Sequence, residues 1–245
     1  KIAQAAGKVV KKTVLELGSN DAYVVLSDAD IALAVKTCVQ GRVVNNGETC
    51  VSAKRFVVSA DVYDEFREQF VKQMAAIKTG DPTQKGTQLG PIARKDLRDT
   101  LHEQVEESVR KGATISTGGK IPEGAGFYYP ATVLENVKPG MPAYDGELFG
   151  PVASLIKAKD DEDAMRIAND SRYGLGGGIF SRNEDRAIEL ARLPFDSGMV
   201  NINGYGLAHP HLPFGGVKDS GYGREHGGFG IREFVNIKAV MITHQ

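Results

Sequence analysis

A single cysteine in a polar loop is the first residue of this chain that could do chemistry. Cys50 stands in the stretch NNGETCVSAKR, residues 45–55, and is one of two cysteines among 245 residues. A thiolate is a strong nucleophile and its thioesters hydrolyse readily, so Cys50 could take part in acyl transfer. Free cysteine is also among the most buried residue types and behaves as a small apolar side chain. Taken alone, the stretch favours this second, structural interpretation.

Two histidines form another chemical candidate. His209 and His211 flank Pro210 in the stretch GYGLAHPHLPFGG. Imidazole is a common metal ligand, but no cysteine, aspartate or glutamate stands at a matching spacing. The sequence therefore predicts no metal site. The pair belongs either to the rim of a binding site or to an ordinary surface loop.

These residues need a scaffold, and the chain predicts one in which strands and helices alternate. Apolar residues spaced by three and four predict helices over residues 29–44, 61–77, 94–111, 160–169 and 184–193. Extended apolar runs predict strands over residues 13–17, 55–59, 113–117, 128–137, 151–158, 176–181 and 198–203. This alternation is typical of an α/β fold with a largely parallel, twisted sheet flanked by helices.

Two local details follow from the same patterns. Asp28 is expected to cap the helix over residues 29–44, and Cys38 falls on the apolar stripe of that helix, so Cys38 is predicted to be a core residue. After a glycine-rich run that starts near Gly221, a short helix and a strand over residues 234–243 are expected.

The composition excludes several classes of function. Apolar residues make up 41% of the chain, charged residues 25%, and the formal net charge is −1. No basic surplus indicates nucleic acid or an anionic membrane as a partner, and the apolar runs are too short to cross a bilayer. Two cysteines without metal-type pairing are typical of a reducing compartment. We therefore expect a cytoplasmic protein.

Four segments along the chain carry a family resemblance. In order they are LELGS (15–19), NGETC (46–50), GELFGP (146–151) and PFGGVKDSGYGRE (213–225). Together they resemble the aldehyde dehydrogenase superfamily, and the chain is most similar to its bacterial branch of NAD(P)-dependent succinate-semialdehyde dehydrogenases. The resemblance implies an aldehyde dehydrogenase catalytic domain, a small aldehyde as substrate and NAD or NADP as cofactor.

The resemblance also implies a division of the chain. Residues 1–18 are expected to be the tail of a Rossmann-like cofactor domain whose remainder, the N-terminal half in this family, is missing here. Residues 19–220 are expected to form the catalytic domain. Residues 221–245 are expected to carry a helix and an oligomerisation strand that joins a neighbouring subunit, which gives a homodimer or homotetramer.

The resemblance assigns the catalytic roles to two residues. Cys50 is implied as the nucleophile that forms a thiohemiacetal and then a thioester. Glu16 is implied as the general base that activates the hydrolytic water, a role for which burial would raise its pKa toward neutrality. A helix is expected to begin near Cys50, where its N-terminus would favour the thiolate and hold the oxyanion. The rival interpretation of Glu16 is a solvated residue at a strand edge.

The resemblance assigns further contacts outside the catalytic pair. It implies cofactor contacts from Leu17, Gly18, Glu147 and Phe149. Phe214 is implied as a wall of the substrate pocket; taken alone, it would be a core residue before a glycine turn. Ser19 departs from the family, which most often has glycine there, and a side chain at that position could alter the approach to the nicotinamide. The loop from Gly204 to Leu212 has no arginine or serine, so it gives no support for a carboxylate-bearing substrate such as succinate semialdehyde.

Two alternatives stay open. As an isolated fragment, the chain could be a folded oligomerisation domain without dehydrogenase activity. It could also be a thiol hydrolase, because acyl transfer needs only a nucleophile and a base. The hydrolase is the weaker alternative because no histidine near Cys50 in the sequence resembles a Cys–His pair.

Overall fold

A seven-stranded sheet forms the centre of the molecule. The structure, a computed structural model, describes residues 1–244. The strand order is β4-β5-β6-β3-β2-β8-β9, and all neighbours run parallel except β4 and β5. The strands are β2 Ala22–Val25, β3 Arg55–Ser59, β4 Thr114–Thr117, β5 Thr132–Glu135, β6 Val152–Ala158, β8 Gly177–Phe180 and β9 Asn201–Ile202. The predicted α/β class with a largely parallel sheet is confirmed.

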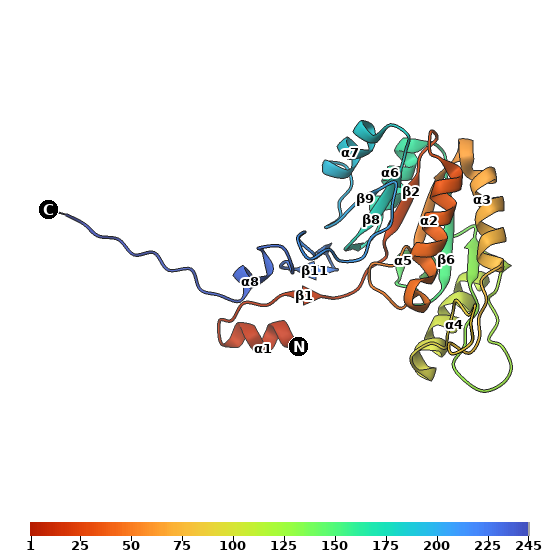
Figure 1. The fold of residues 1–245 in the computed structure, drawn as a ribbon, viewed down its shortest axis with the longest axis horizontal. Helices are drawn as coiled ribbons and strands as arrows, with labels where there is room; N and C mark the ends of the chain where they lie inside the picture. The colour runs from red at the N-terminus through yellow and green to blue at the C-terminus, as the bar shows by residue number, and fades with distance from the viewer. Residues whose placement is uncertain (245) are drawn as a thin grey trace.

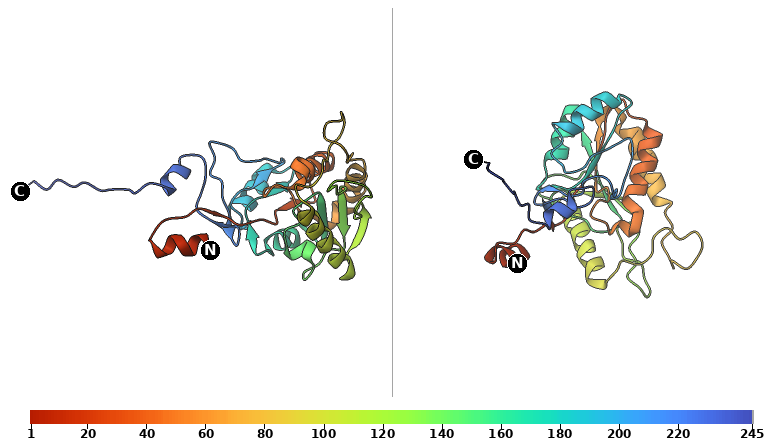
Figure 2. Two further views of the ribbon diagram at one scale, coloured as in Figure 1. Left: turned by 90° about the horizontal axis from the view of Figure 1, so that it is seen from below. Right: turned by 60° about the vertical axis from the view of Figure 1, so that its left-hand side comes forward.

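Helices cover both faces of this sheet (Figures 1 and 2). One face packs against α2 (Ile31–Val43) and α3 (Ala60–Ala75). The other packs against α4 (Lys95–Arg110), α5 (Pro142–Asp145), α6 (Asp161–Asn169) and α7 (Glu184–Arg192). Side chains alternate between the two cores along a strand: Val24 of β2 lies in the second core, and Tyr23 and Val25 lie in the first. Burial on both faces explains why these strands are apolar runs.

The strand β2 is absent from the predictions although it lies in the middle of the sheet. It pairs with β3 on one side and β8 on the other. All four of its residues are buried. The sequence feature that indicates this strand is the apolar run from Ala22 to Leu26, which directly follows the polar Asn20 and Asp21.

The helix predicted over residues 29–44 is present, but its cap is a different aspartate. Asp30 accepts a hydrogen bond from the backbone N–H of Leu33 at 3.0 Å. Asp28 instead accepts hydrogen bonds from the Ser181 hydroxyl, so it ties α2 to the end of β8. Cys38 is fully buried on the inner stripe of α2, as predicted.

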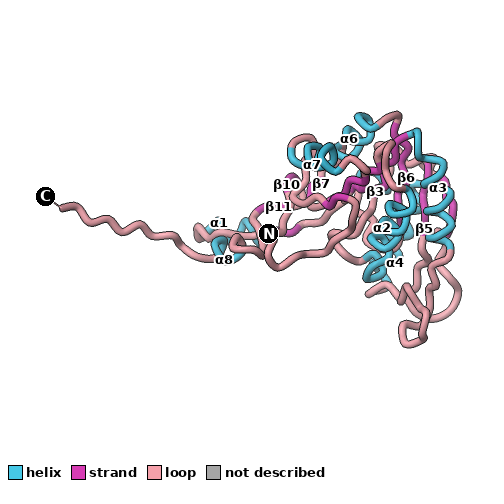
Figure 3. The backbone as a smooth tube through the Cα atoms, turned by 45° about the horizontal axis from the view of Figure 1, so that its top comes forward, coloured by secondary structure: helices cyan, strands magenta, loops and turns pink. Residues whose placement is uncertain are grey.

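Two small antiparallel pairs join distant parts of the chain. β1 (Leu15–Glu16) pairs with β11 (Gly221–Tyr222). β7 (Tyr173–Gly174) pairs with β10 (Val217–Lys218). The strand predicted over residues 13–17 is therefore only two residues long. Beyond β9 the chain is mostly loop (Figure 3).

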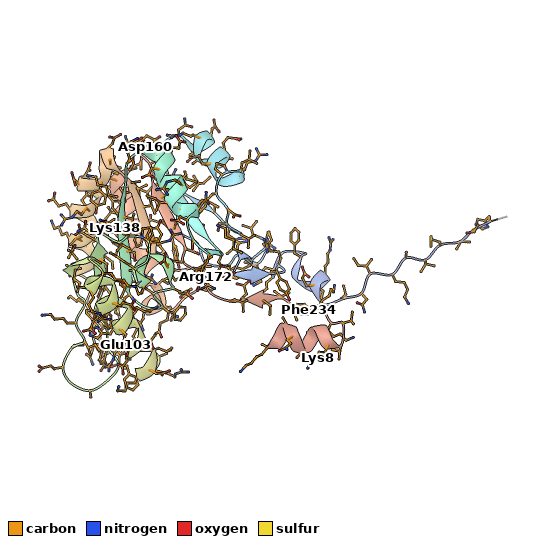
Figure 4. The ribbon with its side chains drawn as sticks, turned by 180° about the vertical axis from the view of Figure 1, so that it is seen from behind. Lys8, Glu103, Lys138, Asp160, Arg172 and Phe234 are labelled. Atoms are coloured by element: carbon orange, nitrogen blue, oxygen red, sulfur yellow. The ribbon has the colours of Figure 1, made fainter. Side chains whose placement is uncertain are left out.

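Both ends of the chain lie on a part that projects from the body. Figure 4 shows Lys8 of α1 (Ile2–Lys8) and Phe234, which follows α8 (Gly230–Glu233), away from Glu103 and Asp160 on the body. The two ends are joined by Lys12, whose ammonium donates to the carbonyl of Arg232 at 3.0 Å. Among the described residues, no helix is long and apolar enough to cross a membrane.

The predicted short helix is α8, but residues 235–244 form no strand within this chain. They extend away from the body, the blue tail in Figure 1. Ile237 is 90% exposed and Val240 82% exposed. A strand needs hydrogen-bonding partners, and none of the other described segments supplies them here. The oligomerisation strand therefore stays a prediction.

Candidate active site

The turn that carries Cys50 is built by three residues with left-handed backbone. Asn45 and Asn46 have φ values of 49° and 57° inside the short 3-10 segment Val44–Gly47, and Gly47 has φ 72°. Asparagine and glycine are the residue types that adopt this conformation at least cost. The chain then turns at residues 49–52, where the Ser52 N–H donates to the Thr49 carbonyl at 3.0 Å. The NNG sequence thus turns the chain sharply before Cys50.

No helix begins at Cys50, so that prediction was wrong. Cys50 lies in a turn, and the chain continues directly into β3 at Arg55. The strand predicted over residues 55–59 is present and pairs with β2 and β6, which leaves too short a segment after Cys50 for a helix to form. The segment that carries Cys50 therefore supplies no helix N-terminus of its own to the thiol.

The turn is anchored from two sides. The Asn46 side chain accepts from the Gly90 N–H at 2.9 Å and donates to the Pro91 carbonyl at 3.0 Å. On the other side, Gly47 packs so closely against Gly150 that a Cβ atom at Gly47 would collide with the Gly150 carbonyl. The NGETC segment and the GELFGP segment are therefore in direct contact.

Cys50 itself is half-buried beside an apolar cavity. It packs against a small cluster formed by Val51, Leu175 and Phe214. Val51 and Phe214 line a cavity of about 240 Å³ together with residues of the loop that contains His209. The structure therefore brings together two predicted site residues, Cys50 and Phe214.

The charges around Cys50 act on its thiol in opposite directions. Burial raises the pKa of Cys50, and the carboxylates of Asp21 and Glu16 add to that effect. The Lys54 ammonium and the Val51 backbone N–H lower the pKa of Cys50. The thiol thus depends on nearby positive groups if it is to ionise near neutral pH.

Lys54 is a site residue that the sequence analysis missed. Its side chain is only 1% exposed, although it is charged. Its Nζ donates to the Cys50 carbonyl and to the Ser19 hydroxyl, each at 2.7 Å. It also forms an ion pair with Glu147 Oε1 at 3.3 Å. The only sequence signal was its position, four residues after Cys50.

Ser19, the departure from the family pattern, belongs to the same cluster. Its side chain is fully buried, and its hydroxyl also lies against the Cys50 carbonyl. Because this hydroxyl is engaged inside the protein, Ser19 serves to connect the LELGS segment to the Cys50 turn.

Asp21 is the second buried ionisable residue that the sequence analysis missed. It lines the cavity beside Cys50 and accepts a hydrogen bond from the Gly176 N–H at 3.0 Å. Its other carboxylate oxygen, Oδ2, has no hydrogen-bond partner among the described residues. Burial raises the pKa of Asp21 to about 6, although the charge of Lys54 opposes this effect.

Glu16 lies on β1 opposite Gly221 of β11. Glu16 is exposed on this strand, in keeping with the rival interpretation. Partial burial of its carboxyl group is nevertheless the largest cause that raises its pKa, followed by the charge of Glu225, while Arg224 lowers it, and the result is a pKa of about 6. No hydrogen bond links Glu16 to Cys50 among the described residues, and the two interact through their charges. The geometry thus favours a base that is ionised at neutral pH, but it does not place Glu16 in contact with the thiol.

The four predicted cofactor residues divide into two groups. Gly18 and Glu147 are adjacent: Gly18 has φ +115°, and a Cβ atom there would lie 2.8 Å from Glu147 Oε2. Leu17 is held by its N–H to the Ser220 carbonyl at 3.1 Å, while its side chain is 59% exposed. Phe149 is 36% exposed. The latter two side chains present apolar surface but do not join the buried cluster.

Of the two histidines considered for the rim of the site, His209 is among the residues that line the cavity. His209 and His211 are both exposed, and their rings are 5.6 Å apart. Within residues 1–244, no group of three or more histidine, cysteine or acidic side chains is arranged to hold a metal ion.

Comparison with known proteins decides the family of this chain. The model of the aldehyde dehydrogenase family matches residues 1–240. The chain belongs to the aldehyde dehydrogenase family. This membership accounts for the order of the four segments around Cys50.

Individual members of the aldehyde dehydrogenase family are similar over almost the whole chain. The succinate semialdehyde dehydrogenase [NAD(P)+] Sad of Escherichia coli is 49% identical over 98% of this chain and 52% of its own length. The succinate-semialdehyde dehydrogenase [NADP(+)] 1 of Mycobacterium ulcerans is 46% identical over 98% of this chain and 52% of its own length. The chain thus spans about half the length of these relatives.

A solved structure from the family agrees with the fold. The succinic semialdehyde dehydrogenase of Streptococcus pyogenes, determined in complex with NADP+, superposes with a TM-score of 0.95 at 39% identity. The match covers 99% of this chain and 53% of that one.

Proposed function

We propose that this chain is the catalytic portion of an NAD(P)-dependent aldehyde dehydrogenase that oxidises a small aldehyde to a carboxylic acid. The observation that carries the proposal is that the half-buried Cys50 packs against the cluster of Val51, Leu175 and Phe214, of which Val51 and Phe214 line a mostly apolar cavity. A nucleophile next to the residues that line a cavity can attack a carbonyl carbon held close to it. Family membership over residues 1–240 supports this assignment.

Cys50 performs the first half of the proposed reaction. Its thiolate adds to the aldehyde carbon and forms a thiohemiacetal. Loss of hydride from that carbon leaves a thioester on Cys50. The Lys54 ammonium supports this step because it lowers the pKa of Cys50.

Glu16 performs the second half. Its carboxylate takes a proton from water as the water oxygen attacks the thioester carbon, and the acid is released as Cys50 regains its thiolate. With a pKa raised to about 6, Glu16 is a stronger base than an ordinary glutamate and is still ionised at neutral pH.

The residues predicted to hold the cofactor fit a dinucleotide at the surface of this chain. Glu147 has one carboxylate oxygen on Lys54 and the other beside Gly18, where the absence of a Cβ atom leaves room for this carboxylate. Leu17 and Phe149 add exposed apolar side chains. NAD or NADP, when bound, supplies the hydride acceptor. In the proposal, Glu147 accepts hydrogen bonds from ribose hydroxyls, and Leu17, Gly18 and Phe149 pack near the nicotinamide.

The substrate remains a proposal at the level of a small aldehyde. The names of the relatives support succinate semialdehyde as the first compound to test. The described lining of the cavity contains Asp21 and no arginine or lysine. A carboxylate on the substrate would therefore need a positive partner from outside this lining.

We further propose that residues 234–243 pair with a sheet of another subunit, since their apolar side chains are exposed. On this view residues 1–18 belong with a cofactor domain, residues 19–220 form the catalytic domain, and residues 221–245 serve assembly into a dimer or tetramer.

Both cysteines are free, which fits the proposed cytoplasmic location.

The proposal is tested by following NADH or NADPH formation with a panel of aldehydes that includes succinate semialdehyde. The intact wild-type protein is compared with its Cys50→Ala variant. Wild-type turnover that disappears in the variant supports the proposal. Assembly without turnover for any aldehyde would favour the oligomerisation role, and turnover retained in Cys50→Ala would refute the role of Cys50.

A further inference from the structure

The Lys54 ammonium is enclosed by the turn that carries Cys50. Three backbone carbonyls of this turn accept hydrogen bonds from Nζ: Cys50 at 2.7 Å, Ser52 at 3.2 Å and Thr49 at 3.4 Å. Burying an ammonium group is costly unless its hydrogen bonds and its charge are satisfied. Here the turn supplies the acceptors, so the turn and the buried ammonium stabilise one another.

The same ammonium reaches two other segments. It donates to the Ser19 hydroxyl at 2.7 Å and pairs with Glu147 Oε1 at 3.3 Å. The lysine backbone is fixed as well, since its N–H donates to the Asp21 carbonyl at 3.1 Å. One buried side chain therefore joins the nucleophile's turn to the segment after Glu16 and to the carboxylate proposed to hold the cofactor.

We propose that Lys54 is a positioning residue that locks the Cys50 turn to Ser19 and Glu147 and thereby sets the reactivity of the Cys50 thiol. This inference rests on the proposed function, because it assigns a role to a residue that acts through the proposed nucleophile. It adds to that function a means of activating the Cys50 thiol, namely the buried Lys54 ammonium in place of a helix N-terminus.

The charged side chains around the Lys54 ammonium and the Cys50 thiol decide how Lys54 affects that thiol. Lys54 faces the carboxylates of Asp21 and Glu147 and the guanidinium of Arg42. Burial lowers the pKa of Lys54, while the two carboxylates favour its charged form. Cys50 faces Lys54, Asp21 and Glu16, of which only Lys54 lowers the pKa of the thiol. Lys54 is thus the cationic side chain that offsets two nearby carboxylates.

The test measures the rate of Cys50 alkylation by iodoacetamide against pH in the intact protein, with peptide-resolved mass spectrometry and without aldehyde or cofactor. In Lys54→Met, we expect the midpoint of the profile to rise by about one pH unit. The thiolate fraction at pH 7 then falls about tenfold, but a more basic thiolate is more nucleophilic, so the net rate falls about threefold. The matched control Lys85→Met removes a lysine from an exposed loop and should leave the profile unchanged.

Two more variants distinguish an effect of charge on the Cys50 thiol from a general disruption of the turn. Asp21→Asn removes a carboxylate that raises the pKa of Cys50, so its midpoint should fall. Lys54→Arg retains the positive charge and should keep the midpoint closer to wild type than Lys54→Met does. Should Lys54→Met not fold, Lys54→Gln supplies a neutral side chain that keeps a hydrogen-bond donor.

The inference is overturned if a folded, neutral Lys54 variant keeps the wild-type midpoint, or if Asp21→Asn moves the midpoint upward. The readout is independent of turnover. Failure of the proposed function would appear as dehydrogenase activity in Cys50→Ala, whereas failure of this inference appears only in the alkylation profile.

Discussion

Glu147 fills the space beside Gly18: a Cβ atom at Gly18 would lie 2.8 Å from the carboxylate oxygen Oε2. Gly18 also has φ +115°, a backbone conformation that side chains disfavour. The two residues come from segments more than a hundred positions apart, so their contact is set by the fold alone. It joins two residues that we propose to contact the cofactor.

Gly18→Ala should therefore impair cofactor binding. We expect the added methyl group to displace the Glu147 carboxylate and the KM for NAD or NADP to rise about tenfold, equal to about 1.4 kcal/mol. Steady-state kinetics with varied cofactor measure this. Gly86→Ala is the matched control, since Gly86 has φ +89° but no neighbouring atom within 4 Å of the added methyl. Equal KM values for the two variants would contradict the prediction.

Gly47→Ala should destabilise the turn that carries Cys50. Its backbone has φ +72°, and a Cβ atom would collide with the carbonyl of Gly150, which cannot move as a flexible side chain can. We expect a loss of about 2–4 kcal/mol in the free energy of unfolding. Gly140→Ala, at φ +89° with open space around it, should cost only about 1 kcal/mol. Denaturant unfolding of both variants decides the point, and similar losses would show that the contact with Gly150 is unimportant.

Asp21→Asn should change how stability depends on pH. The pKa of Asp21 is raised from 3.8 to about 6, so its ionisation is less favourable in the folded protein than in the unfolded chain. The stability that its protonated form contributes is present below pH 3.8 and is lost as the pH rises toward about 6. Relative to wild type, Asp21→Asn should therefore gain stability across this window, by about 3 kcal/mol at most. Urea unfolding at several pH values measures the difference, and a difference that is constant with pH would contradict the assignment.

The pH dependence of turnover should report on Glu16. Its pKa of about 6 predicts that the rate of thioester hydrolysis falls as the pH drops through about 6, because the protonated acid cannot act as a base. Glu225→Gln removes a charge that raises this pKa and should shift the acidic limb to lower pH. Arg224→Gln removes a charge that lowers it and should shift the limb to higher pH. Shifts in the same direction for both variants would exclude Glu16 as the group that titrates.

The sequence alone was sufficient to predict the fold class and the burial of Cys38. Both depend on the periodicity of apolar residues over ten or more positions. It failed at β2, a four-residue strand whose apolar run is too short to separate from its polar neighbours. It also placed a helix near Cys50 where the chain turns into β3. The strand over residues 55–59, which was itself predicted, begins too soon after Cys50 for a helix to form between them.

The candidate site was predictable only in part. The resemblance identified Cys50 and Phe214, and the structure brings them together. It did not identify Lys54, because a lysine is expected on the surface and nothing in its neighbours shows that it is buried. The partners of Lys54 include Ser19 and Glu147, which lie 35 and 93 residues away in the sequence, so only the folded chain reveals them.

The most direct test of the proposed roles, Cys50 as the nucleophile and Glu16 as the general base, is to trap the acyl intermediate. Glu16→Gln in the intact protein, mixed with an aldehyde substrate and NAD or NADP, should release a burst of reduced cofactor and then slow by about two orders of magnitude or more. Mass spectrometry of the quenched protein should show the acyl group on the peptide that contains Cys50. An unchanged steady-state rate, or an acyl group that is absent from Cys50 during the burst, would contradict the account.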